Sequence, residues 1–291
     1  MTQQTKTEET ATAATEAAAQ VPATQAEGGA LVAAGFDDQF HQFSGKGLEN
    51  LTAADLAIPY LSLLQDLSPQ VKKNRAEYVE GAEPGMMLNT LTNCIYTNEQ
   101  GGVDIIPVHW DKSYTEWQPN RGGFVQRHGS EILDQCQRLN GKDTLPNGNE
   151  VETAAVYYVL IVNPDKTLTK ALLTMKSTNL KVSKRLAALI ASQVIISEKH
   201  GPFTPPAFAN LCNLKSVMEQ DDKNQWFLWK PELKGFVKDL FPAQLAQYYF
   251  SESVKFYEAI IKGGIRVQDP TADRTASEGS GQPVEGGASE T

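Results

Sequence analysis

The chain of 291 residues is long enough for one or two domains, and 41% of its residues are hydrophobic, which is enough for a sizeable core. Its formal net charge is −9, of which residues 1–34 carry −3 and residues 269–291 carry −4, so residues 35–268 carry only −2. The overall acidity therefore does not exclude an anionic partner for the middle of the chain. The three cysteines form no CxxC pair, which indicates neither a zinc ribbon nor a disulfide framework.

Both ends of the chain have the composition of disordered segments. Residues 1–34 and 269–291 are rich in small, polar and acidic residues and contain no aromatic residue, so we expect two disordered tails around one domain at residues 35–268. An acidic C-terminal tail can recruit partner proteins, and the alternative is an inert tail that keeps the protein soluble. The sequence has no run of 18 apolar residues and no signal-peptide pattern, so we expect a cytoplasmic protein without a membrane partner.

Between the tails the predicted elements are mainly strands. Residues 53–56 are expected to form a helical turn, and residues 86–96 a strand or tight hairpin with Thr92-Asn93 at its turn. Residues 130–139 are expected to form a short helix that ends before Gly141. Five longer strands are predicted from their β-branched and aromatic residues. They cover residues 103–117, 151–162, 167–176, 207–219 and 225–237.

Two longer helices complete the prediction. One follows Ser177 as its N-cap and runs to about residue 196, between the third and fourth strands; the other begins at Pro242 and runs to Lys262. A helix between the third and fourth strands of a five-stranded meander is the connectivity of an OB-fold. We therefore expect an α+β, mainly β fold: an OB-fold-like five-stranded barrel with added hairpins and a C-terminal helix. A generic α+β sheet with two covering helices is the alternative.

The strongest charge signal lies between Asp165 and Glu198, where six cations occur and no acidic residue does. Three of the cations stand at i, i+3 and i+4 near the start of the predicted middle helix, so they share one helix face. Cations and free amide groups at a helix start suit a phosphate group. The alternative is a solvated face that keeps the helix soluble. The cations predicted to bind nucleic acid are Lys170, Lys176, Lys181, Lys184 and Arg185.

A second signal combines aromatic and basic residues, first around Gly122-Gly123 and again in the fifth predicted strand. Flat rings stack on bases without reading their identity, and arginine adds phosphate or stacking contacts. The alternative is that the rings are ordinary core residues. The residues predicted to bind nucleic acid in this way are Tyr114, Trp117, Arg121, Phe124 and Arg127 in the first set, and Trp226 and Trp229 in the second.

Motifs for catalysis are absent, since the sequence has no GxSxG, P-loop or HExxH pattern. His109, Asp111 and Glu116 could be a fragment of a metal site, but two ligands and a distant carboxylate often coincide in a sequence. We therefore expect no metal, no cofactor and no enzymatic activity. A metal-dependent nuclease remains a further alternative.

Several short stretches form a pattern that resembles a family of tailed-phage replication proteins described as single-stranded DNA-binding. They include Ile58-Pro59-Tyr60-Leu61, Leu67-Ser68-Pro69-Gln70, Gly85-Met86-Met87-Leu88-Asn89-Thr90, Gly122-Gly123-Phe124-Val125 and Lys176-Ser177-Thr178-Asn179-Leu180-Lys181. The resemblance spans about residues 55–240. It implies an OB-type fold, coating of single strands during phage DNA replication, a location in the host cytoplasm, and replication proteins as the partners of a recruiting C-terminal tail.

These observations predict a non-enzymatic protein that binds single-stranded DNA without sequence specificity, in phage DNA replication or recombination. Its phosphate contacts would come from the basic helix start and its base contacts from the aromatic loops. The alternative is a non-enzymatic protein–protein adaptor, or a structural protein associated with the virion, whose aromatic residues contact another chain. No oligomeric state is predicted.

Overall fold

The computed structural model describes residues 38, 40–44, 46–50 and 58–263, and for Arg121 the backbone alone. The chain divides into two compact units, residues 1–51 and 52–291. In the first unit, residues 38 and 40–42 are helical. The two predicted tails, the helical turn expected at residues 53–56 and the predicted recruitment of partners by the C-terminal tail lie outside the described residues.

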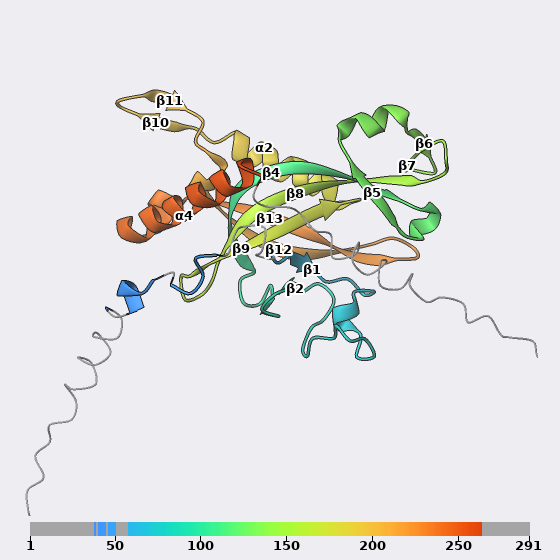
Figure 1. Cartoon of the computed structure of the whole chain (residues 1–291), viewed down its shortest axis with the longest axis horizontal. Coiled ribbons are helices and arrows are strands. Elements are labelled where there is room, and N and C mark those ends of the chain that lie inside the picture. The colour runs from blue at the N-terminus through green and yellow to red at the C-terminus, as the bar shows by residue number, and fades with distance from the viewer. Residues whose placement is uncertain (1–37, 39, 45, 51–57, 264–291) are drawn as a thin grey trace, which may run out of the picture. The chain divides into compact units, whose positions relative to one another are not determined.

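Antiparallel strands dominate the second unit, so the fold is α+β and mainly β, as predicted. The largest sheet follows the order β13-β12-β4-β8-β7-β6, with β5 paired to β4 and β9 paired to β8 (Figure 1). Its strands are β4 (Val103–Trp117), β5 (Phe124–His128), β6 (Gln137–Leu139), β7 (Lys142–Thr144), β8 (Glu150–Val162), β9 (Leu168–Lys176), β12 (Asn210–Gln220) and β13 (Gln225–Phe236).

The five long strands of this sheet correspond to the five predicted strands, and they lie in the order β9-β8-β4-β12-β13. Within the described part of the chain, β9 and β13 do not pair, so the sheet does not form the closed barrel that was expected. Other elements fill the gap, because β1 (Leu61–Leu63) and α2 (Asn179–Ala191) both pack against β9 and β13. The N–H of Leu172 in β9 donates to the carbonyl of Pro59, just before β1, at 2.8 Å.

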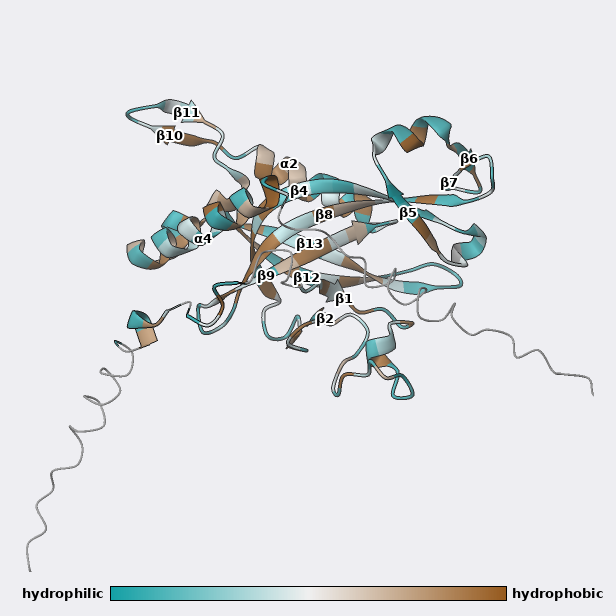
Figure 2. Ribbon diagram, viewed as in Figure 1, coloured by the Kyte–Doolittle hydropathy of each residue, from teal (hydrophilic) through white to brown (hydrophobic). Residues whose placement is uncertain are grey.

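Hydrophobic cores lie on both faces of the central strands. On one face, Tyr157 and Val159 of β8 belong to a cluster that includes Leu186 of α2. On the other face, Tyr158 of β8 packs with Phe256 of α4 (Ala243–Ile261). A strand that is buried on both faces reads as a continuous apolar run, which is the pattern of residues 156–162. Figure 2 shows hydrophobic residues concentrated along these central strands.

A second, smaller sheet has the order β1-β2-β3, with β2 at Met87–Asn89 and β3 at Ile95–Tyr96. Its β2–β3 hairpin confirms the turn predicted at Thr92-Asn93, where Asn93 has a positive φ of 54°. The remaining short helical elements are η1 (Pro69–Val71), η2 (Pro119–Arg121), η3 (Ser130–Gln135), η4 (Ala207–Ala209) and α3 (Val237–Leu240).

The end of the middle helix was predicted wrongly. It stops at Ala191, and the following residues form a two-stranded hairpin of β10 (Ile195–Ser197) and β11 (Gly201–Phe203). The β-branched run Val194-Ile195-Ile196 favours a strand over a helix. The start was also misplaced, because Thr178 is the N-cap and Ser177 precedes it with a φ of 53°.

The helix predicted at residues 130–139 is the second correction. Only η3 is helical there, and residues 137–144 form the β6–β7 hairpin. Its two turn residues, Asn140 and Gly141, have positive φ values of 50° and 80°. Such a pair suits a tight hairpin turn, so Gly141 belongs to a hairpin and not to a helix end.

Candidate nucleic-acid interface

A cavity of about 720 Å³ lies beside the start of β8 and the end of β9, and we call it the first cavity. Its walls come from β1 and its flanking residues, β4, β5, β8, β9, the start of α2, the β12–β13 turn and the first half of β13. Four of the residues predicted to bind nucleic acid line it. They are Arg127, Lys176, Trp226 and Trp229.

Several of the rings predicted to stack on bases are buried. Tyr114 is 7% exposed, Trp117 is 6% exposed and Trp229 is 3% exposed. Tyr114 belongs to a small core with Ile132, Trp117 meets Phe124 edge-on at 6.0 Å, and Trp229 belongs to the main core. Each of these three rings therefore packs against apolar neighbours, as in the alternative that the rings are core residues, and Trp229 also lines the first cavity.

Three other rings lie at the first cavity and keep part of their surface. They belong to Tyr60, Trp226 and Phe227. Tyr60 and Phe227 are not among the residues predicted above to bind nucleic acid, although Phe227 belongs to the same aromatic set as Trp226 and Trp229. The sequence feature that could have indicated Tyr60 is its position directly after Pro59, at the start of an apolar run.

The start of β13 is held in place by Gln65. The amide of Gln65 accepts a hydrogen bond from the N–H of Phe227 at 2.8 Å and donates one to the carbonyl of the same residue at 2.9 Å. The Phe227 ring packs so closely on Gly85 that a Cβ there would come within 2.5 Å of it. The indole Nε1 of Trp226 is buried and has no acceptor among the described residues.

The predicted cations are distributed over three environments. Lys176 lines the first cavity and lies 3.3 Å from Glu152, while the Nζ of Lys170 lies over the ring of Phe256, away from the cavity. Three exposed cations on α2 make no ion pair with another described residue. They are Lys181, Lys184 and Arg185. Ser177, Thr178 and Asn179 line the first cavity, so α2 starts at the wall of that cavity. The three cations lie in the first two turns of α2. For Arg121 the structure describes only the backbone.

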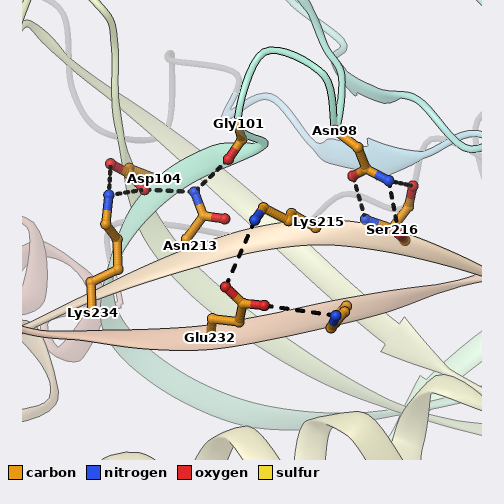
Figure 3. Close-up of polar contacts among 9 residues, drawn as sticks. Asn98, Gly101, Asp104, Asn213, Lys215, Ser216, Glu232 and Lys234 are labelled. Carbon is orange, nitrogen blue, oxygen red and sulfur yellow. Dashed lines mark hydrogen bonds and ion pairs between the residues drawn. The ribbon is translucent and has the colours of Figure 1, made fainter.

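The outer face of β12 and β13 carries further cations, but those cations are paired. Glu232 lies 3.8 Å from both Lys215 and Lys230, and Asp104 lies 3.1 Å from Lys234 (Figure 3). Asn213 also donates to Asp104, at 2.7 Å. This face therefore offers less positive charge to a phosphate than α2 does.

Residues 118–149 form an arm between β4 and β8, and Glu116 anchors it. The Glu116 side chain is buried, and its carboxylate lies 2.6 Å from Nε2 of His128 and accepts a hydrogen bond from Asn149 at 2.5 Å. Burial alone would raise the pKa of the Glu116 carboxyl, but hydrogen bonds from Asn149, His128 and Gln126 outweigh it and hold the pKa below its ordinary value. The anchor fixes β5, which carries Arg127 into the first cavity.

We expect Glu116→Gln to lower the free energy of unfolding at neutral pH by about 1–3 kcal/mol, since hydrogen bonds to a charged group contribute more than neutral ones. A carboxyl whose pKa is lowered by folding stabilises the protein above its unfolded pKa and loses that effect as the pH falls through the folded pKa. The difference between wild type and variant should therefore shrink in acid. Urea unfolding across pH measures it, with the exposed Glu219→Gln as control. A difference that stays constant in acid would contradict this assignment.

The fragment of a metal site considered above does not assemble. Glu116 is engaged by the arm, whereas His109 packs against Tyr158 and Tyr257 at centroid distances of 5.7 and 6.0 Å. In the part of the chain that the structure describes, no three His, Cys, Asp or Glu side chains gather as metal ligands. Among the same residues, no helix has the length and apolar character needed to cross a membrane.

A family model described as Pam3 phage gp34-like protein matches residues 26–266. No match was found among curated proteins or among solved structures.

Proposed function

We propose that this chain, a phage protein that belongs to the Pam3 phage gp34-like protein family, binds single-stranded DNA without sequence specificity. The proposed role is in phage DNA replication or recombination, in the host cytoplasm. The bound strand would pass through the first cavity and along the exposed face of α2.

The position of the first cavity is the observation that carries this proposal. In an OB-fold, oligonucleotides bind at the second and third strands and at the loops between strands one and two and between strands four and five. If β4, β8, β9, β12 and β13 are counted as strands one to five, the cavity lies at β8 and β9. Arg127, from strand β5 in the connection between β4 and β8, and Asn224, from the β12–β13 turn, both line it. We therefore interpret the sheet as an OB-type sheet that is open between β9 and β13.

The chemistry of the first cavity suits bases more than phosphates. Its charged lining residues balance, with Arg127 and Lys176 against Glu152 and Asp221. The partly exposed rings offer stacking surfaces, which tolerate any base. Hydroxyl and amide groups from β4, β9 and the start of α2 supply neutral hydrogen-bond partners. Positive charge for the DNA backbone comes from α2, where the three cations have no acidic partner among the described residues.

Reversing two charges on α2 tests the electrostatic part of the proposal. If three phosphates are neutralised there, the log–log salt slope of binding should be about −2, since each contact to a single strand contributes roughly −0.7. Lys181→Glu with Lys184→Glu should reduce that slope by about 1.4 and weaken binding by at least tenfold at low salt. Titration of the four tryptophans with oligo-dT at several salt concentrations measures both quantities.

The matched control reverses two exposed lysines elsewhere, Lys199→Glu with Lys255→Glu, which changes the net charge equally. We expect the control to bind oligo-dT nearly as well as wild type. Equal losses in both double variants would assign binding to net charge alone. If the α2 variant binds oligo-dT as well as wild type does, the α2 cations form a solvated helix face and do not contact DNA.

A second candidate function, a protein–protein adaptor or a virion-associated protein, is favoured by exposed apolar residues away from the first cavity. Ile196 on the β10–β11 hairpin is 84% exposed, and Tyr248, Phe250 and Tyr257 of α4 also present rings to solvent. Exposed aromatic residues are enriched in protein interfaces. If wild type fails to bind oligo-dT at low salt but forms a defined complex with another phage protein, this second function replaces the first.

A further inference from the structure

A second cavity, of about 560 Å³, lies in the segment between β1 and β2. The segment is firmly held: the N–H of Gly85 donates to the carbonyl of Leu64 at 2.8 Å, and that of Val79 donates to Gln70 at 3.0 Å. Leu64, Ala82 and Leu88 form a small buried core beneath it. The second cavity is therefore bounded by a segment with its own core, and not by a loose loop.

Gln225 connects the two cavities, because it lines both of them. Its side-chain amide donates to Asp66, a residue of the second cavity, at 3.2 Å. Next to it, Gln65 lines the first cavity and holds Phe227 through two hydrogen bonds. A ligand that fills the first cavity and extends past the start of β13 therefore reaches the second.

The second cavity offers the same two kinds of group as the proposed DNA site. Lys72 and Lys73 are exposed in its lining and pair with no acidic residue that the structure describes, and Tyr78 keeps part of its ring surface. Asp66 and Glu83 also line it, so its formal charge is balanced. The Asp66 carboxylate is already hydrogen-bonded to Gln225, whereas the lysines can turn toward a ligand.

We propose that one single strand of nucleic acid occupies both cavities. It would leave the first cavity over Gln225, place two phosphates near Lys72 and Lys73, and stack a base on Tyr78. This inference rests on the proposed function and extends it, because it names a second part of the binding site and increases the number of nucleotides bound. Neither the charge pattern nor the aromatic pattern of the sequence had drawn attention to residues 66–84.

The test compares one double variant, which carries both Lys72→Glu and Lys73→Glu, with wild type. It uses oligo-dT of about 4 and about 16 nucleotides, which are the limits of the sites that single OB-folds occupy. We expect the double variant to bind the long oligonucleotide at least tenfold more weakly, with a salt slope about 1.4 smaller, since two contacts are lost. Binding of the short oligonucleotide, which the first cavity and the exposed face of α2 would hold, should change little at about 0.15 M salt, where the Debye length is roughly 8 Å.

Two further variants sharpen the comparison. Glu83→Gln removes a negative charge from the second cavity and should strengthen binding of the long oligonucleotide only. Lys199→Glu with Lys255→Glu is the matched control; Lys199 lies near the tip of the β10–β11 hairpin, on the other side of the molecule from the β1–β2 segment (Figure 1).

The outcomes separate this inference from the proposed function. Suppose that wild type binds both oligonucleotides. If the Lys72/Lys73 double variant then binds the long one as tightly as wild type does, or loses affinity equally for both, the path through the second cavity is wrong and the proposed site at the first cavity stands. If wild type binds neither oligonucleotide, the proposed function fails, and this inference fails with it.

Discussion

Trp226→Ala is expected to weaken binding of oligo-dT by about 5- to 150-fold, because stacking on an aromatic ring contributes roughly 1–3 kcal/mol per base and each 1.4 kcal/mol is tenfold. Trp226 lines the first cavity, keeps part of its surface and has a buried indole N–H without a partner in the described structure. Its strand position is fixed by pairing with Glu219 across the β12–β13 hairpin. Fluorescence anisotropy of labelled oligo-dT measures the effect independently of tryptophan emission.

Two variants control this prediction. Trp226→Phe keeps a flat ring and should retain most of the affinity. Trp110→Ala removes a ring that is 42% exposed on β4 but lies outside the first cavity, and it should leave affinity unchanged. Circular dichroism establishes that each variant is folded. If Trp110→Ala weakens binding as much as Trp226→Ala does, the bound strand follows a different surface.

Phe256→Ala is expected to lower the free energy of unfolding by about 3–5 kcal/mol, the range for removing a buried phenyl ring. Phe256 is fully buried between α4 and the sheet, where its ring meets Tyr158 edge-on at 6.3 Å and lies beneath the Nζ of Lys170. Since domains gain only about 5–15 kcal/mol from folding, this loss is a large fraction of the total. Urea unfolding followed by circular dichroism measures it.

The control for Phe256 is Lys255→Ala, one residue earlier on the same helix. Lys255 is exposed and, among the described residues, its ion-pair partner is Glu252, so its loss should cost less than about 1 kcal/mol. The stability loss in Phe256→Ala should leave oligo-dT binding by the folded fraction intact, because the ring lies outside the first cavity. A loss below about 1 kcal/mol would mean that α4 contributes little to the fold.

The long elements could be predicted from sequence because their patterns reflect local physical chemistry. Residues 151–162 and 167–176 are β-branched and aromatic on either side of Asn163-Pro164-Asp165-Lys166, and they form the β8–β9 hairpin. The C-terminal helix starts at Ala243, directly after Pro242. The errors fell on short segments, where Asn140-Gly141 was read as the end of a helix instead of a hairpin turn.

The candidate site was only partly predictable. The sequence predicts which rings and cations bind nucleic acid, and of these Trp226, Lys176 and Arg127 line the first cavity. The sequence could not distinguish these three cavity residues from the buried Trp117 and Tyr114, because the residue type alone does not say whether an aromatic side chain faces solvent or a core.

By itself, the sequence determined which segments become strands and helices. The signals for them are the spacing of hydrophobic residues, β-branched side chains and turn residues, and each depends on residues that are close together in the sequence. It also determined that the cations of α2 have no acidic residue nearby along the chain. Only the tertiary structure decided that the sheet stays open, which rings are buried and that Gln225 joins two cavities. Those features depend on contacts between residues far apart in the chain, such as Gln65 with Phe227, and no local pattern encodes them.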